Sequence, residues 1–200
     1  PIGSFICGTW NDVLKKRCSV ASMIRTLCLV WISNFVGALL IVFLNYSSGQ
    51  YDMSQGLLGA YTIKVALGKV NLSVSQCITS GILCNILVCI AVLMAGAARD
   101  IDGKIWAVFF PILAFVLGGY EHCVANMYYI SAGIVCKTNP AYVNKAMEVY
   151  GYTAEQLGTL DLSNMVIHNL LPVTLGNIIG GMVFVALPLY YLYIKIRKTV

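Results

Sequence analysis

A glutamate and a histidine lie next to each other inside a long apolar part of the chain. Glu121 and His122 follow the glycine pair Gly118-Gly119, and Asn126 comes one helical turn later. Ionisable groups are costly inside a membrane and mark functional sites by default, and irregular backbone at that depth survives only against protein or a water-filled cavity. Histidine also changes its charge near neutral pH. We therefore predict a polar break that lines a pore or binding site; a buried histidine bonded to Glu121 or Asn126 is the structural alternative.

Three other residues are candidates for the same site. Asn85 lies within an apolar run, where it either faces a pore or bonds to a neighbouring helix. Lys69 is either a fixed positive charge that attracts anions or a lysine that extends its head group to the membrane surface. Phe115 comes one turn before the glycines and either narrows a pore or packs like any other aromatic side chain. Each of these alternatives stays open on the residues alone.

The elements that carry these residues must be membrane helices. The chain is 59% hydrophobic and only 10% charged, whereas a soluble domain carries about 25% charged residues. Apolar stretches of roughly 20 residues are long enough to cross a bilayer. We predict one transmembrane channel domain over residues 1–200, with spans at about 23–46, 73–98, 104–135, broken near 118–123, and 165–194.

The positions of the basic residues predict the orientation of these spans. Lysines and arginines gather at 10–25, at 98–104 and after the last span, and the loop at 46–60 has none. The positive-inside rule then places those three regions, the C-terminus included, in the cytoplasm of a cell-membrane protein. The loops 46–60 and 138–164 lie outside, although Lys137 and Lys145 do not follow the rule.

The eight cysteines do not form a metal-binding pattern. Most of them lie inside apolar segments, where cysteine is a small buried hydrophobe, and no CxxC pair occurs. We therefore predict no metal and no cofactor.

Two short segments resemble each other. S-N-F-V-G-A at 33–38 is similar to G-N-I-I-G-G at 176–181, and the two spans that carry them run in opposite directions across the membrane. Repeats of opposite topology are typical of transporters and channels, while small-residue motifs also serve ordinary helix packing. A true repeat predicts two further spans before Pro1, the second of them broken, with residues 1–9 as its tail.

Three longer motifs carry a resemblance to a known family. G-Y-E-H-C-V-A-N-M-Y-Y-I at 119–130, N-L-L-P-V-T-L-G-N-I-I-G-G at 169–181 and C-N-I-L-V-C-I-A-V at 84–92 are similar to the formate/nitrite transporter family. The resemblance implies an all-α, aquaporin-like six-helix protomer with an inverted 3+3 repeat and broken helices, whose first two helices are missing here. It also implies a homopentamer in the lipid bilayer that conducts formate, nitrite, hydrosulfide or lactate.

The resemblance also assigns roles to single residues. His122 matches the central pore histidine, Asn126 the asparagine after it, Asn85 a pore-facing asparagine and Lys69 the lysine before that. Constriction positions of the family correspond to Phe115 and Val88. The family's loop partner of the histidine would lie at or before Ser4, and its typical L-F-T pattern is not visible.

The resulting hypothesis is a channel or transporter for a small monovalent anion rather than an enzyme. Glu121 and His122 would make it pH-dependent, and the backbone N–H groups at the start of the following half-helix would add donors for the anion. A membrane subunit of a redox enzyme is the alternative that His122 and His168 suggest. An aquaporin-like channel for neutral solutes is a further alternative.

Overall fold

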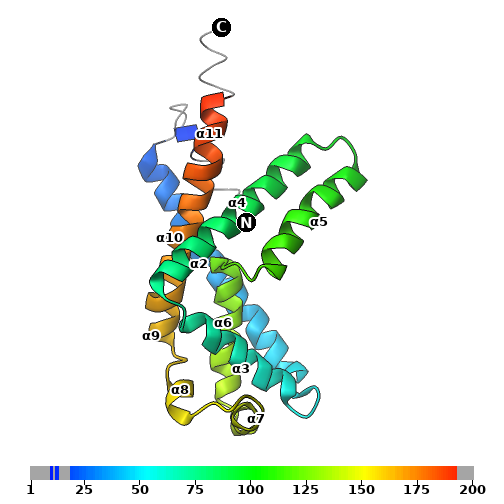
Figure 1. Cartoon of the computed structure of the whole chain (residues 1–200), viewed down its shortest axis with the longest axis vertical. Coiled ribbons are helices and arrows are strands. Elements are labelled where there is room, and N and C mark those ends of the chain that lie inside the picture. The colour runs from blue at the N-terminus through cyan, green and yellow to red at the C-terminus, as the bar shows by residue number, and fades with distance from the viewer. Residues whose placement is uncertain (1–9, 11, 14–18, 193–200) are drawn as a thin grey trace. The chain divides into compact units, whose positions relative to one another are not determined.

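A computed structural model describes residues 10, 12–13 and 19–192 of the chain. Every described element is a helix, which confirms the all-α prediction. Our predictions for residues 1–9, for most of the basic cluster before the first span and for the basic C-terminal tail lie outside the described residues. The elements are α2 (Val20–Ser47), η1 (Gln50–Asp52), α3 (Leu57–Val70), α4 (Val74–Ala97), α5 (Ile101–Leu117), α6 (Cys123–Lys137), α7 (Pro140–Tyr150), α8 (Ala154–Gly158), α9 (Leu162–Asn164), η2 (Met165–Leu170), α10 (Leu171–Ile179), η3 (Gly180–Ala186) and α11 (Leu187–Tyr190) (Figure 1).

Three helical stretches of the described chain are long and apolar enough to cross a membrane. They are Val20–Ser47, Val74–Ala97 and Leu162–Tyr190. The last stretch joins α9 to α11 and contains two π-helical segments, η2 and η3. Such segments are rare and are frequent at functional sites.

The expected break separates α5 from α6. Asp100 caps the start of α5, where its Oδ1 accepts a hydrogen bond from Gly103 N at 2.6 Å. The helix ends at Leu117, and Gly119 has a φ of 65°, a left-handed conformation that glycine adopts without strain. Helix resumes at Cys123, so Tyr120, Glu121 and His122 lie in non-helical backbone.

The chain divides into two compact units, each assembled from separate stretches of sequence. Unit 1 contains the described residues up to Trp31, residues 78–122 and the last helix from Val173. Within it the backbone of α10 lies directly against the backbone of α4. The contact is so close that a Cβ on Gly176 would collide with the carbonyl oxygen of Ile78. Small residues allow this close approach of two helices in a membrane protein.

Unit 2 contains residues 32–77 and 123–172. In it α3 packs along α6, and α7 packs against both helices (Figure 1). The buried residues of α3 recur every three or four positions, which gives the helix one apolar face (Gly59, Ala60, Ile63, Ala66, Leu67 and Val70). Gly133 of α6 lies so close to Ala66 that no larger residue would fit without a shift.

Candidate functional site

The break between α5 and α6 is held by side chains of unit 1. Glu121 is 4% exposed, and its backbone N–H donates to Ser80 Oγ of α4 at 3.0 Å. Its carbonyl oxygen accepts a hydrogen bond from Asn177 Nδ2 of α10 at 3.1 Å. Both polar backbone groups of Glu121 therefore have side-chain partners on neighbouring helices, which fixes the chain immediately before His122.

Two buried asparagines extend this network. Asn177 Nδ2 also donates to the carbonyl oxygen of Gly81 at 2.8 Å. Asn85 Nδ2 in turn donates to the carbonyl oxygen of Asn177. Asn85 is fully buried, and its Oδ1 has no hydrogen-bond partner among residues 10, 12–13 and 19–192. A buried acceptor of this kind is costly unless a ligand or water supplies a donor.

His122 lies beside an aromatic ring. The centroids of the His122 and Phe115 rings are 6.0 Å apart, with an angle of 38° between the ring planes. Both side chains are partly buried, and Val88 is buried on α4. Unit 1 therefore brings together a titratable imidazole, an aromatic ring and buried amides in a largely apolar environment.

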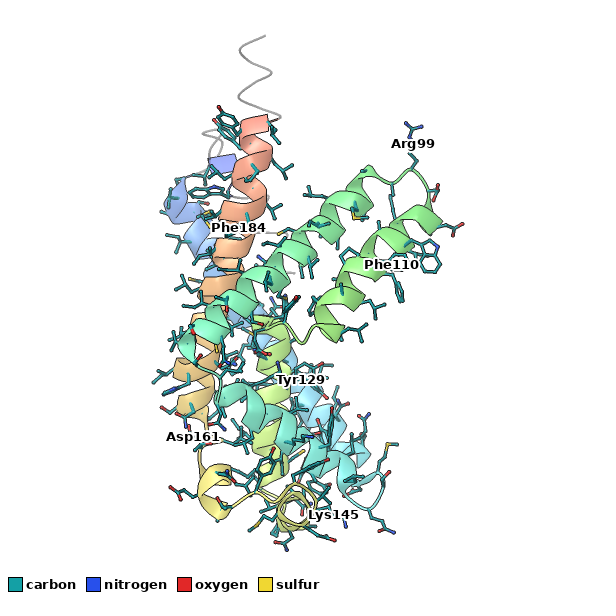
Figure 2. The ribbon with its side chains drawn as sticks, viewed as in Figure 1. Arg99, Phe110, Tyr129, Lys145, Asp161 and Phe184 are labelled. Carbon is teal, nitrogen blue, oxygen red and sulfur yellow. The ribbon has the colours of Figure 1, made fainter. Side chains whose placement is uncertain are left out.

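The remaining two candidates, Asn126 and Lys69, belong to unit 2. Asn126 is fully buried, and its Nδ2 donates to Asn169 Oδ1 at 2.8 Å. Asn169 Nδ2 donates to the backbone oxygen of Lys69 at 2.8 Å. The Lys69 ammonium group lies 5.6 Å from the centre of the Tyr129 ring, a cation–π distance. Tyr129 is labelled on α6 in Figure 2.

Three residues of these networks had no predicted role. Asn169 and Asn177 lie in the motif at 169–181, but an asparagine in an apolar helix is equally compatible with ordinary helix pairing. Ser80 gives no sequence signal at all, because serine is common in membrane helices. Only the helix contacts reveal that all three bond to backbone groups at or next to candidate residues.

The second histidine does not support the redox alternative. His168 is exposed on η2 of unit 2, and its carbonyl oxygen accepts a contact from Cys77 Sγ at 3.5 Å. Within the described residues no group of three or more histidine, cysteine, aspartate or glutamate side chains could hold a metal ion.

Comparison with known proteins identifies similar sequences. A family model described as "Formate/nitrite transporter" matches residues 6–191. The chain is 38% identical to a "Probable formate transporter" of Methanothermobacter thermautotrophicus, over 92% of this chain and 64% of that protein. It is 36% identical to "Formate channel FocA" of Escherichia coli (strain K12), over 94% of this chain and 61% of that protein. The chain therefore spans less than two thirds of the length of these relatives, which are named as transporters and channels rather than enzymes.

Solved structures give the same result for the fold. A "Pentameric formate channel with formate bound" superposes with a TM-score of 0.78 at 31% identity, covering 88% of this chain and 69% of that one. An "FNT family ion channel" superposes with a TM-score of 0.74 at 28% identity, covering 96% of this chain and 68% of that one. Both are named as channels, which agrees with the prediction of an all-α channel fold.

Proposed function

Because this chain belongs to the formate/nitrite transporter family, we propose that it conducts a small monovalent anion, formate first, across a cell membrane. The similar relatives are named as formate transporters and channels, and a similar solved structure has formate bound. Nitrite and hydrosulfide are the further anions that we propose as substrates.

The observation that carries this proposal is the non-helical segment between α5 and α6, which is stabilised by hydrogen bonds to the backbone of Glu121. Two side chains from different helices bond to the N–H and the C=O of that residue, and they thereby keep polar, non-helical backbone stable between apolar helices. A membrane protein retains such backbone only where it is buried against protein or lines a water-filled cavity, and we assign this break to the second case. The same interruption presents His122, and histidine is the side chain whose ordinary pKa lies nearest to neutral pH.

The charges and amides of the site suggest a sequence of steps for the anion. Lys69 attracts the anion electrostatically, and apolar side chains such as Phe115 and Val88 then exclude a hydrated ion. Removing water from a bare charge costs many kcal/mol, so passage is easier for the neutral acid. His122 donates the proton to the anion, and the neutral imidazole that results takes up a proton again from the solvent, with Glu121 as its neighbour in the chain.

Asn85 fits the neutral form of the solute. Its buried Oδ1 is an acceptor that has no donor among the described residues, and an acceptor repels a bare anion but binds an acid O–H or a water. Asn126, whose Nδ2 already donates to Asn169, is proposed as a second polar group on the path. These roles complete the set of residues that we propose for the site.

The assembly and orientation are part of the same proposal. We place residues 1–200 in one channel domain that assembles as a homopentamer, by analogy with the pentameric structure. The turn at 98–104 and the C-terminus lie in the cytoplasm according to the positive-inside rule. Each protomer of the proposed pentamer then forms its own pore, and the pores surround a shared axis.

The first test is the pH dependence of formate flux in proteoliposomes that contain the full chain. Flux through the unsubstituted chain should change between about pH 5 and 8, where an imidazole changes its charge. His122→Asn keeps a polar side chain but cannot be protonated in this range, so its profile should be flat. Stopped-flow pH and isotope-uptake measurements record both profiles.

A matched control is available because the chain has a second histidine. His168→Asn changes an exposed residue outside the proposed path and should keep the unsubstituted profile. If His122→Asn keeps the same pH dependence as the unsubstituted chain, His122 has no proton role. Competition of nitrite, hydrosulfide and lactate with labelled formate then ranks the substrates.

A further inference from the structure

Asn169 is hydrogen-bonded to two of the candidate residues of unit 2. We infer that it is a positioning residue for the anion path, one that holds Lys69 and Asn126 in place without touching the anion. The inference rests on the proposed function and adds to it a residue with no role assigned from the sequence. Asn169 is fully buried, so it acts through its neighbours.

Both ends of the Asn169 amide are used. Its Oδ1 accepts from Asn126 Nδ2 at 2.8 Å, and its Nδ2 donates to the Lys69 carbonyl oxygen at 2.8 Å. Asn126 and Lys69 lie on different helices, α6 and α3. One side chain therefore connects two residues that are independently proposed to meet the anion.

The bond to Lys69 satisfies a need of α3. Lys69 lies in the last turn of that helix, and the last four carbonyl groups of any helix have no partner inside it. Asn169 supplies a donor for one of them. This hydrogen bond connects the end of α3, where the Lys69 side chain is attached, to the last helix.

The lysine head group has its own contact on the same side of the network. Its Nζ lies 5.6 Å from the centre of the Tyr129 ring, and Tyr129 is three residues after Asn126 on α6. Through Asn169 the backbone of Lys69 is connected to Asn126 of α6. The ammonium group of Lys69 contacts Tyr129, which also lies on α6. A shift of α3 relative to α6 would therefore move the charge off the ring.

The helix that carries Asn169 has an unusual form at this point. Asn169 belongs to η2, a π-helical segment of six residues. A π-helical turn contains an extra residue, which changes the direction in which the following side chains point. In this proposal the π-helical turn is retained because it directs the side chain of Asn169 toward both of its partners, Asn126 and Lys69.

The test compares formate uptake by proteoliposomes over a range of formate concentrations. Asn169→Ala should raise the concentration for half-maximal flux roughly tenfold, in the range by which charged clefts concentrate counter-ions, with little change in maximal flux per folded protein. Asn169→Asp keeps an acceptor for Asn126 but places an oxygen against the Lys69 carbonyl. It should give the same rise, and it provides a second variant if Asn169→Ala fails to fold.

The matched control is Asn164 of α9. Asn164 Nδ2 also donates to a backbone carbonyl, that of Thr159, at 2.8 Å, and its backbone N–H donates to Asp161 Oδ1, so these described hydrogen bonds involve neither Lys69 nor Asn126. Asn164→Ala should leave the half-maximal concentration unchanged. Equal effects of Asn164→Ala and Asn169→Ala would overturn the positioning role and leave only a structural one.

A double variant separates positioning of Lys69 from any other effect. Lys69→Gln removes the charge itself, so Asn169→Ala should add nothing further in that background. A further rise in the half-maximal concentration in the double variant would contradict the inference. Absence of formate flux through the unsubstituted chain would overturn the proposed function, and this inference with it.

Discussion

At the scale of single residues, the position of His122 depends on contacts that its own side chain does not make. The N–H and the C=O of Glu121 bond to Ser80 and Asn177, and a single peptide bond joins Glu121 to His122. Buried backbone groups need such partners, because each one left without a partner costs about 1–3 kcal/mol. Ser80 and Asn177 therefore fix the position of the backbone from which the His122 side chain extends.

The contribution of Ser80 is testable by removing its oxygen. Ser80→Ala deletes the acceptor of the Glu121 N–H and should lower the stability by about 1–3 kcal/mol, together with the maximal formate flux. Thermal unfolding in detergent and uptake by proteoliposomes measure the two effects. Ser131→Ala is the control, since the Ser131 hydroxyl makes a long contact of 3.7 Å to Met165 Sδ. If the two variants have the same melting temperature and flux, the Ser80 contact does not hold the break.

At the scale of elements, the sequence predicts the membrane helices better than it predicts their irregularities. Long apolar stretches indicate where α2 and α4 lie, and a glycine pair before polar residues indicates the end of α5. The π-helical segments η2 and η3 leave no such signal, because the apolar pattern of one long helix continues through them. Helix α3 lies outside the predicted spans, and its apolar face becomes recognisable once α6 is seen to cover it.

The loop helix α7 is fixed by a hydrogen bond that depends on pH. The Tyr142 hydroxyl donates to Asp52 Oδ1 at 2.5 Å; both residues lie outside the predicted spans. Burial, followed by this hydrogen bond, raises the pKa of Tyr142 to about 12. A raised pKa means that the neutral phenol stabilises the fold below about pH 10, the ordinary value for tyrosine, and that this contribution is lost as the pH rises to 12.

Tyr142→Phe should remove that pH dependence. The melting temperature of the unsubstituted chain should fall more steeply between pH 10 and 12 than that of the Phe variant, while the unsubstituted chain is the more stable one at pH 8. Thermal scans in detergent at a series of pH values provide the comparison. Tyr61→Phe, which alters an exposed tyrosine, is the control. Parallel curves for Tyr142→Phe and the unsubstituted chain would contradict the assignment.

At the scale of the whole molecule, segments distant in sequence combine into two compact units. Unit 1 takes residues from three parts of the described chain and unit 2 from two. This arrangement cannot be predicted from composition and periodicity. The candidate residues are likewise shared: unit 1 holds Asn85, Glu121 and His122, and unit 2 holds Lys69 and Asn126. Their residue types and positions in apolar segments already make these five candidates, and the motif resemblance assigns their expected roles, whereas the helices that support them are known only from the structure.

The orientation in the membrane is the whole-molecule prediction. Arg99 lies at the turn between α4 and α5, and Lys145 projects from α7 (Figure 2). The positive-inside rule places the first of these in the cytoplasm and α7–α8 outside. In a chain with its native cysteines replaced, Glu155→Cys should react with a membrane-impermeant maleimide in intact cells, and Asp102→Cys should react only after lysis. Labelling of Asp102→Cys in intact cells would show the opposite orientation.

The close contact between α4 and α10 determines how this part of the chain can vary during evolution. A Cβ on Gly176 would meet the backbone of Ile78, and one on Gly180 would lie 2.5 Å from the carbonyl oxygen of Ile82. Backbone cannot rotate away as a flexible side chain can, so any homologous chain that keeps this helix contact must keep glycine at both positions. At Gly68 and Gly96 an added Cβ meets no atom of the described chain within 4 Å beyond the adjacent backbone of its own helix, so alanine there causes no clash with another helix. Glycines that look equivalent in the sequence therefore tolerate mutation very differently.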